Sequence, residues 1–331
     1  MRKYARPLFG ALISAAAVYA IIRNVSISEV AHATAGAKPS FIVIGVVALA
    51  LGYAIRSFRW WRMLRLGNGS ISLNSTARVL MAGFAANNVL PLRAGDALRA
   101  FGFRATLGIS SSFAVATLVL ERLLDLFSLL LLALCFMKVG GLTSLPHNVV
   151  RLVQVLTLAC LAAIIVALAF GAQIRRCLLW LLNTCFPKAE RGSKLELAIT
   201  NITSLFESLR PIEALHLTAL SLAAWFLEAL LYICAARALH LQVSFAWACM
   251  ALVAGNFAAI FPSSPGYVGT FHASVLAILL FAGVERNLAA AYAVAIHGVL
   301  WCTVTLAGAI AYFSLRIKAV QTLPDSTGEV V

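Results

Sequence analysis

The stretch A-A-A-Y-A-V-A-I-H-G-V-L-W-C-T-V-T-L-A-G-A-I-A, residues 289–311, contains no charged side chain. A helix needs roughly 20 such residues to cross a bilayer core that is about 30 Å thick. Similar apolar runs occupy 126–137 and 152–170. The strands of a membrane β-barrel would instead be about 10 residues long and would alternate between apolar and polar residues. The sequence therefore predicts an all-α, polytopic bundle of transmembrane helices.

The composition of the whole chain supports the same class. Apolar residues make up 62% of the 331 and charged residues 11%, and the mean hydropathy is +0.94. A soluble domain has about 25% charged residues. The formal net charge of +14 comes from Lys and Arg in short segments between apolar runs, as positive-inside topology requires. We therefore expect membrane lipids with anionic headgroups as partners, and no nucleic acid.

The cysteines and histidines form no pattern that is typical of a cofactor site. None of the seven cysteines belongs to a CxxC motif, and most lie within apolar runs, where cysteine is a packing residue. The six histidines form neither HExxH nor HxH. We predict no metal site, no cofactor and no catalytic residues.

Six segments are long and apolar enough to be predicted as full membrane spans. Arg2, Lys3 and Arg6 precede the first one and would also fit a signal peptide. No clear cleavage site follows, so we expect an uncleaved span. The predicted spans are 8–22, 40–61, 111–137, 150–171, 213–236 and 289–315.

Two further apolar stretches, 75–107 and 246–283, are interrupted by residues that break helices. Proline removes a backbone donor, glycine weakens a helix, and non-helical backbone at membrane depth must be buried in protein or line a wet cavity. We interpret both stretches as re-entrant hairpins of two half-helices; an extramembrane loop is the alternative. The interruptions are Asn87, Asn88, Pro91, Arg93, Gly95, Asp96 and Arg99 in the first, and Pro262, Ser263, Ser264, Pro265, Gly266 and Gly269 in the second.

The two hairpins occupy matching places in the sequence. The interval from Pro91 to Pro265 equals that from Gly95 to Gly269, and each hairpin lies between two long spans. With both termini on the inner side, the second unit runs opposite to the first, which predicts an inverted repeat. The chain is then one integral membrane domain, with a first span and outer loop at 1–36, repeat units at 37–137 and 213–318, a connecting span and inner amphipathic loop at 138–212, and a disordered tail at 319–331.

Ionisable side chains at membrane depth cost at least about 2.5 kcal/mol each and usually face a partner or a cavity. Arg93, Asp96 and Arg99 of the first hairpin are spaced i,i+3. This spacing fits a solvated ion-pair ladder. It also fits a site at which Arg93 receives an anionic group such as a lipid phosphate.

The span at 111–137 carries three charges near its middle. Glu121 and Asp125 are one turn apart on one helix face, with Arg122 beside them. The basic residues of the first hairpin are their nearest partners, and both a structural ion-pair cluster and a ligand-binding cluster fit. In the span at 213–236, Glu228 is a lone acid that must pair, be protonated or contact water.

Four arginines recur every three residues near the inner end of the span at 40–61, together with Trp60 and Trp61. Long basic side chains at such a place extend along the helix and put their charges among the headgroups. We predict this arrangement for Arg56, Arg59, Arg62 and Arg65.

A family resemblance begins at residues 87–99, which read N-N-V-L-P-L-R-A-G-D-A-L-R. This stretch resembles the N-x-x-x-P-x-R-x-G-[DE]-x-x-R signature of the lysylphosphatidylglycerol synthase transmembrane-domain family, which are flippase-like membrane proteins. Glu121-Arg122 and P-S-S-P-G-Y-V-G at 262–269 are similar to two further motifs of that family. The resemblance implies movement of lipids or lipid-linked headgroups across the bacterial cytoplasmic membrane, and some members accompany hopanoid pathways.

The resemblance has two departures and one limit. An acidic residue that is usual near 270–272 is missing, and His297 stands where an arginine is common. The resemblance does not extend to the soluble domain of the full synthases, so we do not expect synthesis of lysyl-lipid. The candidate substrate-binding residues are Asn87, Asn88, Arg93, Asp96, Arg99, Glu121, Arg122, Asp125, Glu228, Pro265, Gly266, Gly269 and His297.

We expect a lipid flippase or transporter of the bacterial inner membrane that moves an anionic, polyprenyl- or hopanoid-type lipid, and not an enzyme. Movement would follow a gradient or be coupled to protons through a carboxylate such as Glu228 or Glu121. One alternative is a membrane-embedded transferase acting on a lipid phosphate or sterol-like lipid, with Glu121, Asp125 or Asp96 as general acid or base. Another is a non-catalytic partner of lipid-biosynthesis enzymes.

Overall fold

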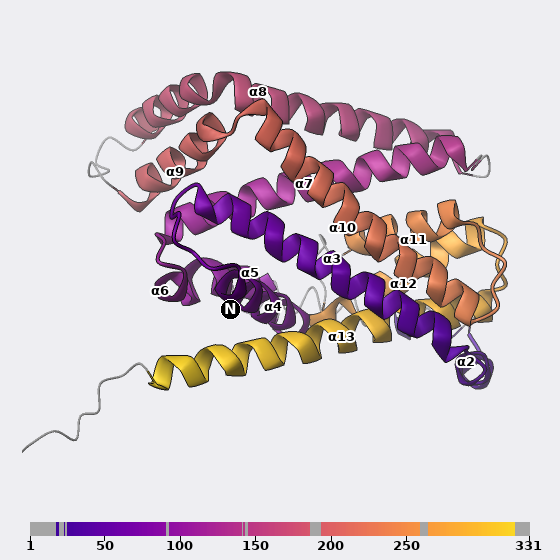
Figure 1. The fold of residues 1–331 in the computed structure, drawn as a ribbon. Coiled ribbons are helices and arrows are strands. Elements are labelled where there is room, and N and C mark those ends of the chain that lie inside the picture. Colours follow the sequence, from indigo (N-terminus) through magenta and orange to yellow (C-terminus); the bar gives the residue numbers. More distant parts are fainter. Residues whose placement is uncertain are drawn as a thin grey trace, which may run out of the picture.

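The computed structural model describes residues 25–90, 93–140, 145–185, 193–258 and 264–321, together with 18, 19, 23 and 142. Most of the predicted span at 8–22, Pro91, Pro262, Ser263 and most of the predicted tail lie outside this part. The regular elements of the described part are helical (Figure 1). They are α2 (Ile27–Ala35), α3 (Pro39–Arg65), α4 (Leu73–Val89), α5 (Ala94–Ala97), a π-turn (Leu98–Gly102), α6 (Arg104–Leu107), α7 (Ser111–Val139), α8 (His147–Cys185), α9 (Lys194–Ser208), α10 (Pro211–Ala238), α11 (Phe245–Ala258), a 3-10 turn (Pro265–Tyr267), α12 (Thr270–Phe281) and α13 (Arg286–Gln321).

Four of the described helices are long and apolar enough to cross a membrane, so the chain is a multi-pass membrane protein. α7 covers the predicted span at 111–137 as one helix of 29 residues, although it carries three charges near its centre. The four helices are α3, α8, α10 and α13 as far as Leu315, and they confirm helices at the predicted spans 40–61, 150–171, 213–236 and 289–315.

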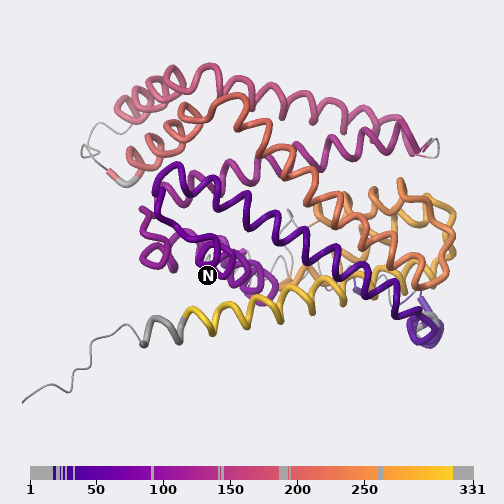
Figure 2. Tube along the Cα trace, in the orientation of Figure 1, coloured from indigo at the N-terminus to yellow at the C-terminus, as the bar shows by residue number. Residues whose placement is uncertain are grey.

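The segment between the two predicted repeat units forms two helices. α8 is longer than the predicted span, because it bends at Phe170 (φ −124°, ψ 23°) and continues to Cys185. α9 forms in the predicted inner loop and packs against α7 and α8, with Leu205 and Phe206 buried. Figure 2 shows α8 along one side of the bundle and α13 along the opposite side.

Polar side chains define where several helices begin. Ser72, Ser110 and Ser193 each accept a hydrogen bond from a backbone amide in the first turn of α4, α7 and α9. Glu285 does the same for α13 and accepts from two first-turn N–H groups at 2.9 and 3.0 Å. These hydrogen bonds to the charged form hold the pKa of the Glu285 carboxyl below its usual range.

Two antiparallel helix pairs make the most extensive contacts among the described helices. α3 runs against α10, and at one end the Lys38 amide donates to the Ala238 carbonyl at 2.9 Å. Gly52 permits this close approach, because a Cβ there would lie 3.2 Å from the Ala224 carbonyl oxygen. α4 packs against α13. The two pairs bring elements of the two predicted repeat units side by side.

Each interrupted stretch is broken where the sequence predicted. In 75–107, α4 is followed by a break and then by α5, the π-turn and α6. Asn68, in the turn before α4, donates to the Leu107 and Gly108 carbonyls at 3.4 and 3.2 Å, so the segment that leads into this stretch lies beside its end. In 246–283, the 3-10 turn separates α11 from α12. In Figure 1, α4 to α6 lie toward one end of the bundle, and α11 and α12 toward the other.

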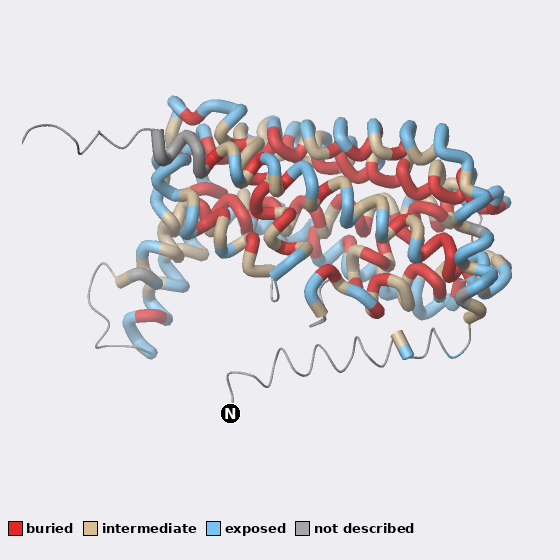
Figure 3. Tube along the Cα trace, turned by 90° about the horizontal axis from the view of Figure 1, so that it is seen from below, coloured by how far each residue is buried: buried red, intermediate tan, exposed pale blue. Residues whose placement is uncertain are grey.

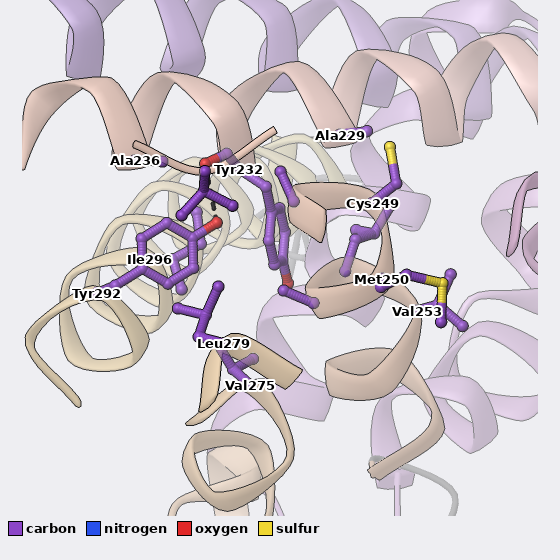
Figure 4. Packing of buried hydrophobic residues seen from close by; sticks show 14 of the residues in the cluster. Ala229, Tyr232, Ala236, Cys249, Met250, Val253, Val275, Leu279, Tyr292 and Ile296 are labelled. Carbon is purple, nitrogen blue, oxygen red and sulfur yellow. Dashed lines mark hydrogen bonds between the residues drawn. The ribbon is translucent and has the colours of Figure 1, made fainter. Parts of the chain in front are cut away.

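Buried apolar side chains hold these elements together. In the larger cluster, between α10, α11, α12 and α13, the Tyr292 hydroxyl donates to the Tyr232 carbonyl at 2.8 Å (Figure 4). Figure 3 shows buried residues on the sides of the helices that face the interior. Outward-facing apolar residues such as Val43, Val47 and Leu51 are exposed, as expected for a surface that contacts lipid.

Candidate functional site

The middle of the bundle contains a cavity of about 150 Å³ between the breaks of the two interrupted stretches. Its walls come from α3, α4, α7, α10, α11, α12 and α13 and from both breaks. Of the candidate residues, Asn87, Asn88, Arg93, Arg122, Asp125, Glu228, Gly266 and His297 line it, whereas Asp96, Arg99, Glu121, Pro265 and Gly269 do not.

Asp96 connects the first hairpin to α7. Both of its carboxylate oxygens lie 3.1 Å from the Arg122 guanidinium. Asn87 at the end of α4 donates to Asp96 at 3.1 Å and accepts from the Asp96 amide at 3.2 Å. Asp96 is therefore held from both sides, and it keeps the partly exposed Arg122 at the cavity wall.

Arg99 and Glu121 form a second pair between the hairpin and α7. Two N–H groups of Arg99 donate to the two oxygens of Glu121 at 2.9 and 2.7 Å, and both side chains are almost completely buried. The guanidinium also lies over the Trp60 ring, 4.0 Å from its centroid. The bidentate geometry satisfies two buried charges at once, which indicates that this pair holds the π-turn against α7.

Arg56 and Arg59 pair with carboxylates inside the bundle, so the prediction that they reach the headgroups is wrong. Arg56 lies 2.9 Å from Glu228, and Arg59 lies 2.6 Å from Asp125. Their residue exposures are only 3% and 1%. The physical reason is that α10 packs on the face of α3 that carries Gly52, which removes this face from lipid. The other two arginines of the series, Arg62 and Arg65, are exposed.

The tips of the two interrupted stretches meet at the cavity. The Nε–H of Arg93 donates to the Tyr267 hydroxyl at 3.3 Å. The side-chain amide of Asn88 donates to the Thr305 hydroxyl of α13 at 3.0 Å, and the backbone carbonyl of Asn88 accepts from the indole N–H of Trp301 at 3.3 Å. Residues from both breaks and from α13 therefore form one continuous wall.

Two histidines join the second break to α13. Nε2 of His272 lies 3.2 Å from Nδ1 of His297, and Nδ1 of His272 accepts from the Gly269 amide at 3.3 Å. A neutral imidazole has one N–H, so this pattern assigns the proton of His272 to Nε2, from which it is donated to His297. His272 and His297 stand where the family resemblance led us to expect an acid and an arginine.

Arg93 is the arginine at the site that has no acidic partner. Within the described residues, Arg93 takes part in no ion pair, whereas its neighbours each pair with a carboxylate. The arginines therefore exceed the carboxylates by one. The arginines are Arg56, Arg59, Arg93, Arg99 and Arg122, and the carboxylates are Asp96, Glu121, Asp125 and Glu228.

Membrane-spanning helices around a polar, charge-rich cavity define a multi-pass membrane protein with an internal site. The family model described as the lysylphosphatidylglycerol synthase TM region matches residues 8–308. The chain belongs to this family, which confirms the resemblance seen in the 87–99 motif. No curated protein matches the chain.

Sequence reasoning missed several residues of this site. Arg56 and Arg59 lie on the same helical stripe as Gly45 and Gly52, and a glycine stripe of this kind was the available signal that another helix packs there. Tyr267 occupies the position in the second break that matches Arg93 in the first. The interval of 174 residues that separates Pro91 from Pro265 leads from Arg93 to Tyr267, so this interval was the available signal for Tyr267.

Proposed function

We propose that the protein is a flippase that moves an anionic lipid headgroup between the leaflets of the bacterial cytoplasmic membrane without changing the lipid chemically. The observation that carries this proposal is Arg93, a cavity-lining guanidinium without an ion-pair partner in the described chain. A headgroup must shed water to cross about 30 Å of hydrocarbon. Charge-assisted hydrogen bonds from arginine replace that hydration, and one surplus positive charge matches one phosphate monoanion.

An adjoining cavity supports an amphipathic ligand. This second cavity, of about 300 Å³, shares Arg93 and Arg122 with the first and is otherwise lined in part by Leu126, Leu129 and Phe257. A headgroup at Arg93 would leave its hydrocarbon chain against these apolar side chains. A small soluble anion would make no use of them, which favours a lipid as substrate.

We also propose that the two units, each with its interrupted stretch, form an inverted repeat. Arg93 and Tyr267 are 174 residues apart, which is also the interval between Gly95 and Gly269. Both have left-handed backbones, with φ of 54° and 59°, which is uncommon for residues other than glycine. In the two units α4 corresponds to α11, and α7 corresponds to α13. The packing of α4 on α13 therefore matches the packing of α11 on α7. These matches support two equivalent hairpins that open alternately toward the two sides of the membrane.

A membrane-embedded transferase is the alternative that the carboxylates argue against. Such an enzyme needs an acid or base that is free to exchange a proton with its substrate. Asp96, Glu121, Asp125 and Glu228 are each within ion-pair distance of an arginine. Their negative charges are therefore engaged in holding the arginines at the site.

The proposal is tested with purified protein in liposomes that contain a labelled lipid in one leaflet. Arrival of the unchanged label in the other leaflet, faster than in protein-free vesicles, is the expected result for an anionic phospholipid. Polyprenyl phosphate and a hopanoid would be assayed in parallel, because the family resemblance leaves both as substrates. Mass spectrometry of the lipid identifies a transferase if a new species forms. Neither movement nor conversion would indicate a partner of lipid-biosynthesis enzymes.

The proposed topology, with both termini cytoplasmic, is tested by labelling single cysteines in a chain whose seven native cysteines are replaced by serine. Ser244, exposed between α10 and α11, is expected to react from outside as Ser244→Cys. Ser70, exposed between α3 and α4, is expected to react as Ser70→Cys only after the membrane is permeabilised. Reaction of Ser70→Cys with an impermeant reagent in intact cells would contradict this orientation.

A further inference from the structure

The contact between His272 and His297 differs from the other polar contacts at the cavity because both partners can bind a proton. No described carboxylate forms an ion pair with either ring, and the Phe271 ring lies 4.8 Å from that of His297. The histidines are also hydrogen-bonded to the hairpin tip at two points, the Gly269 amide and the backbone of Gly266. Other elements also contribute titratable or charged groups to the same cavity. They are Tyr53 and Arg56 of α3, Arg93 at the start of α5, Arg122 and Asp125 of α7, Glu228 and Tyr232 of α10, and Tyr267 of the 3-10 turn.

The positions of the four ring nitrogens determine where an added proton must go. The two facing nitrogens, Nε2 of His272 and Nδ1 of His297, hold one hydrogen between them. If that contact is kept, a protonated pair has an N–H on each outer nitrogen. One of these is Nδ1 of His272, which in the neutral pair accepts from the Gly269 amide. The new N–H group at Nδ1 of His272 would then face the N–H group of Gly269, so the hydrogen bond between these two residues is lost.

The lost hydrogen bond is the one that caps α12. Gly269 is the N-cap residue and His272 is the third residue of the helix, the position from which a Glu or Gln side chain accepts in a capping box. Gly269 also has φ of 90°, so the backbone at this point is already in an unusual conformation. Loss of the cap therefore releases the turn that connects α12 to the cavity wall at Gly266 and Tyr267.

We propose that the His272–His297 pair is a proton-binding site whose occupation uncaps α12 and moves the second hairpin, so that passage of the lipid is linked to a proton. This inference rests on the proposed flippase function. The proton is taken from and returned to water, and only N–H bonds form and break. The carboxylates Glu121 and Glu228 are less suited to this role, because each lies within 2.9 Å of an arginine.

The variant that separates proton binding from packing is His272→Gln. Glutamine at this position keeps a capping acceptor for Gly269 but binds no proton. In liposomes with equal pH on both sides, transfer by the unmodified protein is expected to change at least about fivefold over a range from about pH 4 to 8, which includes and extends below the usual titration range of histidines. Transfer by His272→Gln is expected to stay within about twofold over the same range. His216→Gln, which changes an exposed histidine of α10, is the matched control and is expected to keep the pH dependence of the unmodified protein.

A second measurement does not depend on lipid movement. The hydrogen-exchange rate of the Gly269 amide is measured in the unmodified protein and in His272→Gln at each pH. The ratio of the first rate to the second is expected to rise as the pH falls. A constant ratio, or unchanged pH dependence of transfer in His272→Gln, would overturn the proton site even if lipid moves. Accelerated exchange without lipid movement at any pH would support the proton site and overturn the proposed flippase instead.

Discussion

Arg93→Ala is expected to slow lipid transfer at least about 30-fold, because removal of one partner of a desolvated charge pair costs about 2–5 kcal/mol. The rate of label movement in proteoliposomes measures this effect. The folded state should be little affected, since Arg93 forms no ion pair in the described chain and its hydrogen bond is to the neutral Tyr267 hydroxyl. Thermal unfolding of the same preparation checks that point.

Three further variants separate the charge of Arg93 from its surroundings. Arg93→Lys keeps a positive charge and is expected to retain part of the activity. Tyr267→Phe removes the hydroxyl that Arg93 contacts and should have a smaller effect than Arg93→Ala. Arg62→Ala removes an exposed arginine of α3 and is the matched control. Normal transfer by well-folded Arg93→Ala would exclude Arg93 as the headgroup site.

Glu121→Gln is expected to destabilise the protein by about 3–5 kcal/mol, because it leaves the charge of Arg99 buried without its bidentate partner. In a thermal unfolding assay in detergent, this corresponds to an apparent Tm lower by roughly 10 °C. The π-turn that carries Arg99 should also lose protection from hydrogen exchange, since Glu121 connects it to α7.

Two comparisons test whether burial of the charge is the cause. Glu207→Gln breaks an Arg–Glu pair between α8 and α9 whose side chains are 33% and 26% exposed, so it should cost less than about 1 kcal/mol. The double variant Arg99→Met with Glu121→Leu replaces both charges by apolar groups and should be more stable than Glu121→Gln alone. Equal losses in Glu121→Gln and Glu207→Gln would show that the pair contributes nothing through its burial.

Much of the fold followed from local properties of the sequence. The charge-free run at 289–311 required a membrane helix, and the prolines and glycines required breaks near residues 91 and 265. The basic residues of the first hairpin were expected to be partners of the charges in α7, because charges in a membrane are costly without partners, and Arg99 does pair with Glu121. These features depend on the residues and the solvent, and therefore can be predicted without knowing how the helices pack.

The features that were missed depend on which helix faces which. An arginine near a membrane surface either extends to the headgroups or meets an acid on another helix, and Arg56 alone does not decide between them. The contact of α3 with α10, which Gly52 permits, decides it in favour of Glu228. The meeting of His272 with His297 likewise required the position of α12 beside α13. The bend of α8 at Phe170, by contrast, has a local signal in the adjacent Gly171, since glycine weakens a helix.

The left-handed backbones at Arg93 and Tyr267 have a consequence for protein engineering. A residue with a side chain is less stable in this conformation than glycine by roughly 1–2 kcal/mol. Directed evolution for heat resistance would therefore favour glycine at both positions, and the selected variants would lack the guanidinium and the phenol at the hairpin tips. Stabilised forms prepared for crystallography should be chosen with these two positions held constant, because the most robust variants would be the ones least able to bind a ligand.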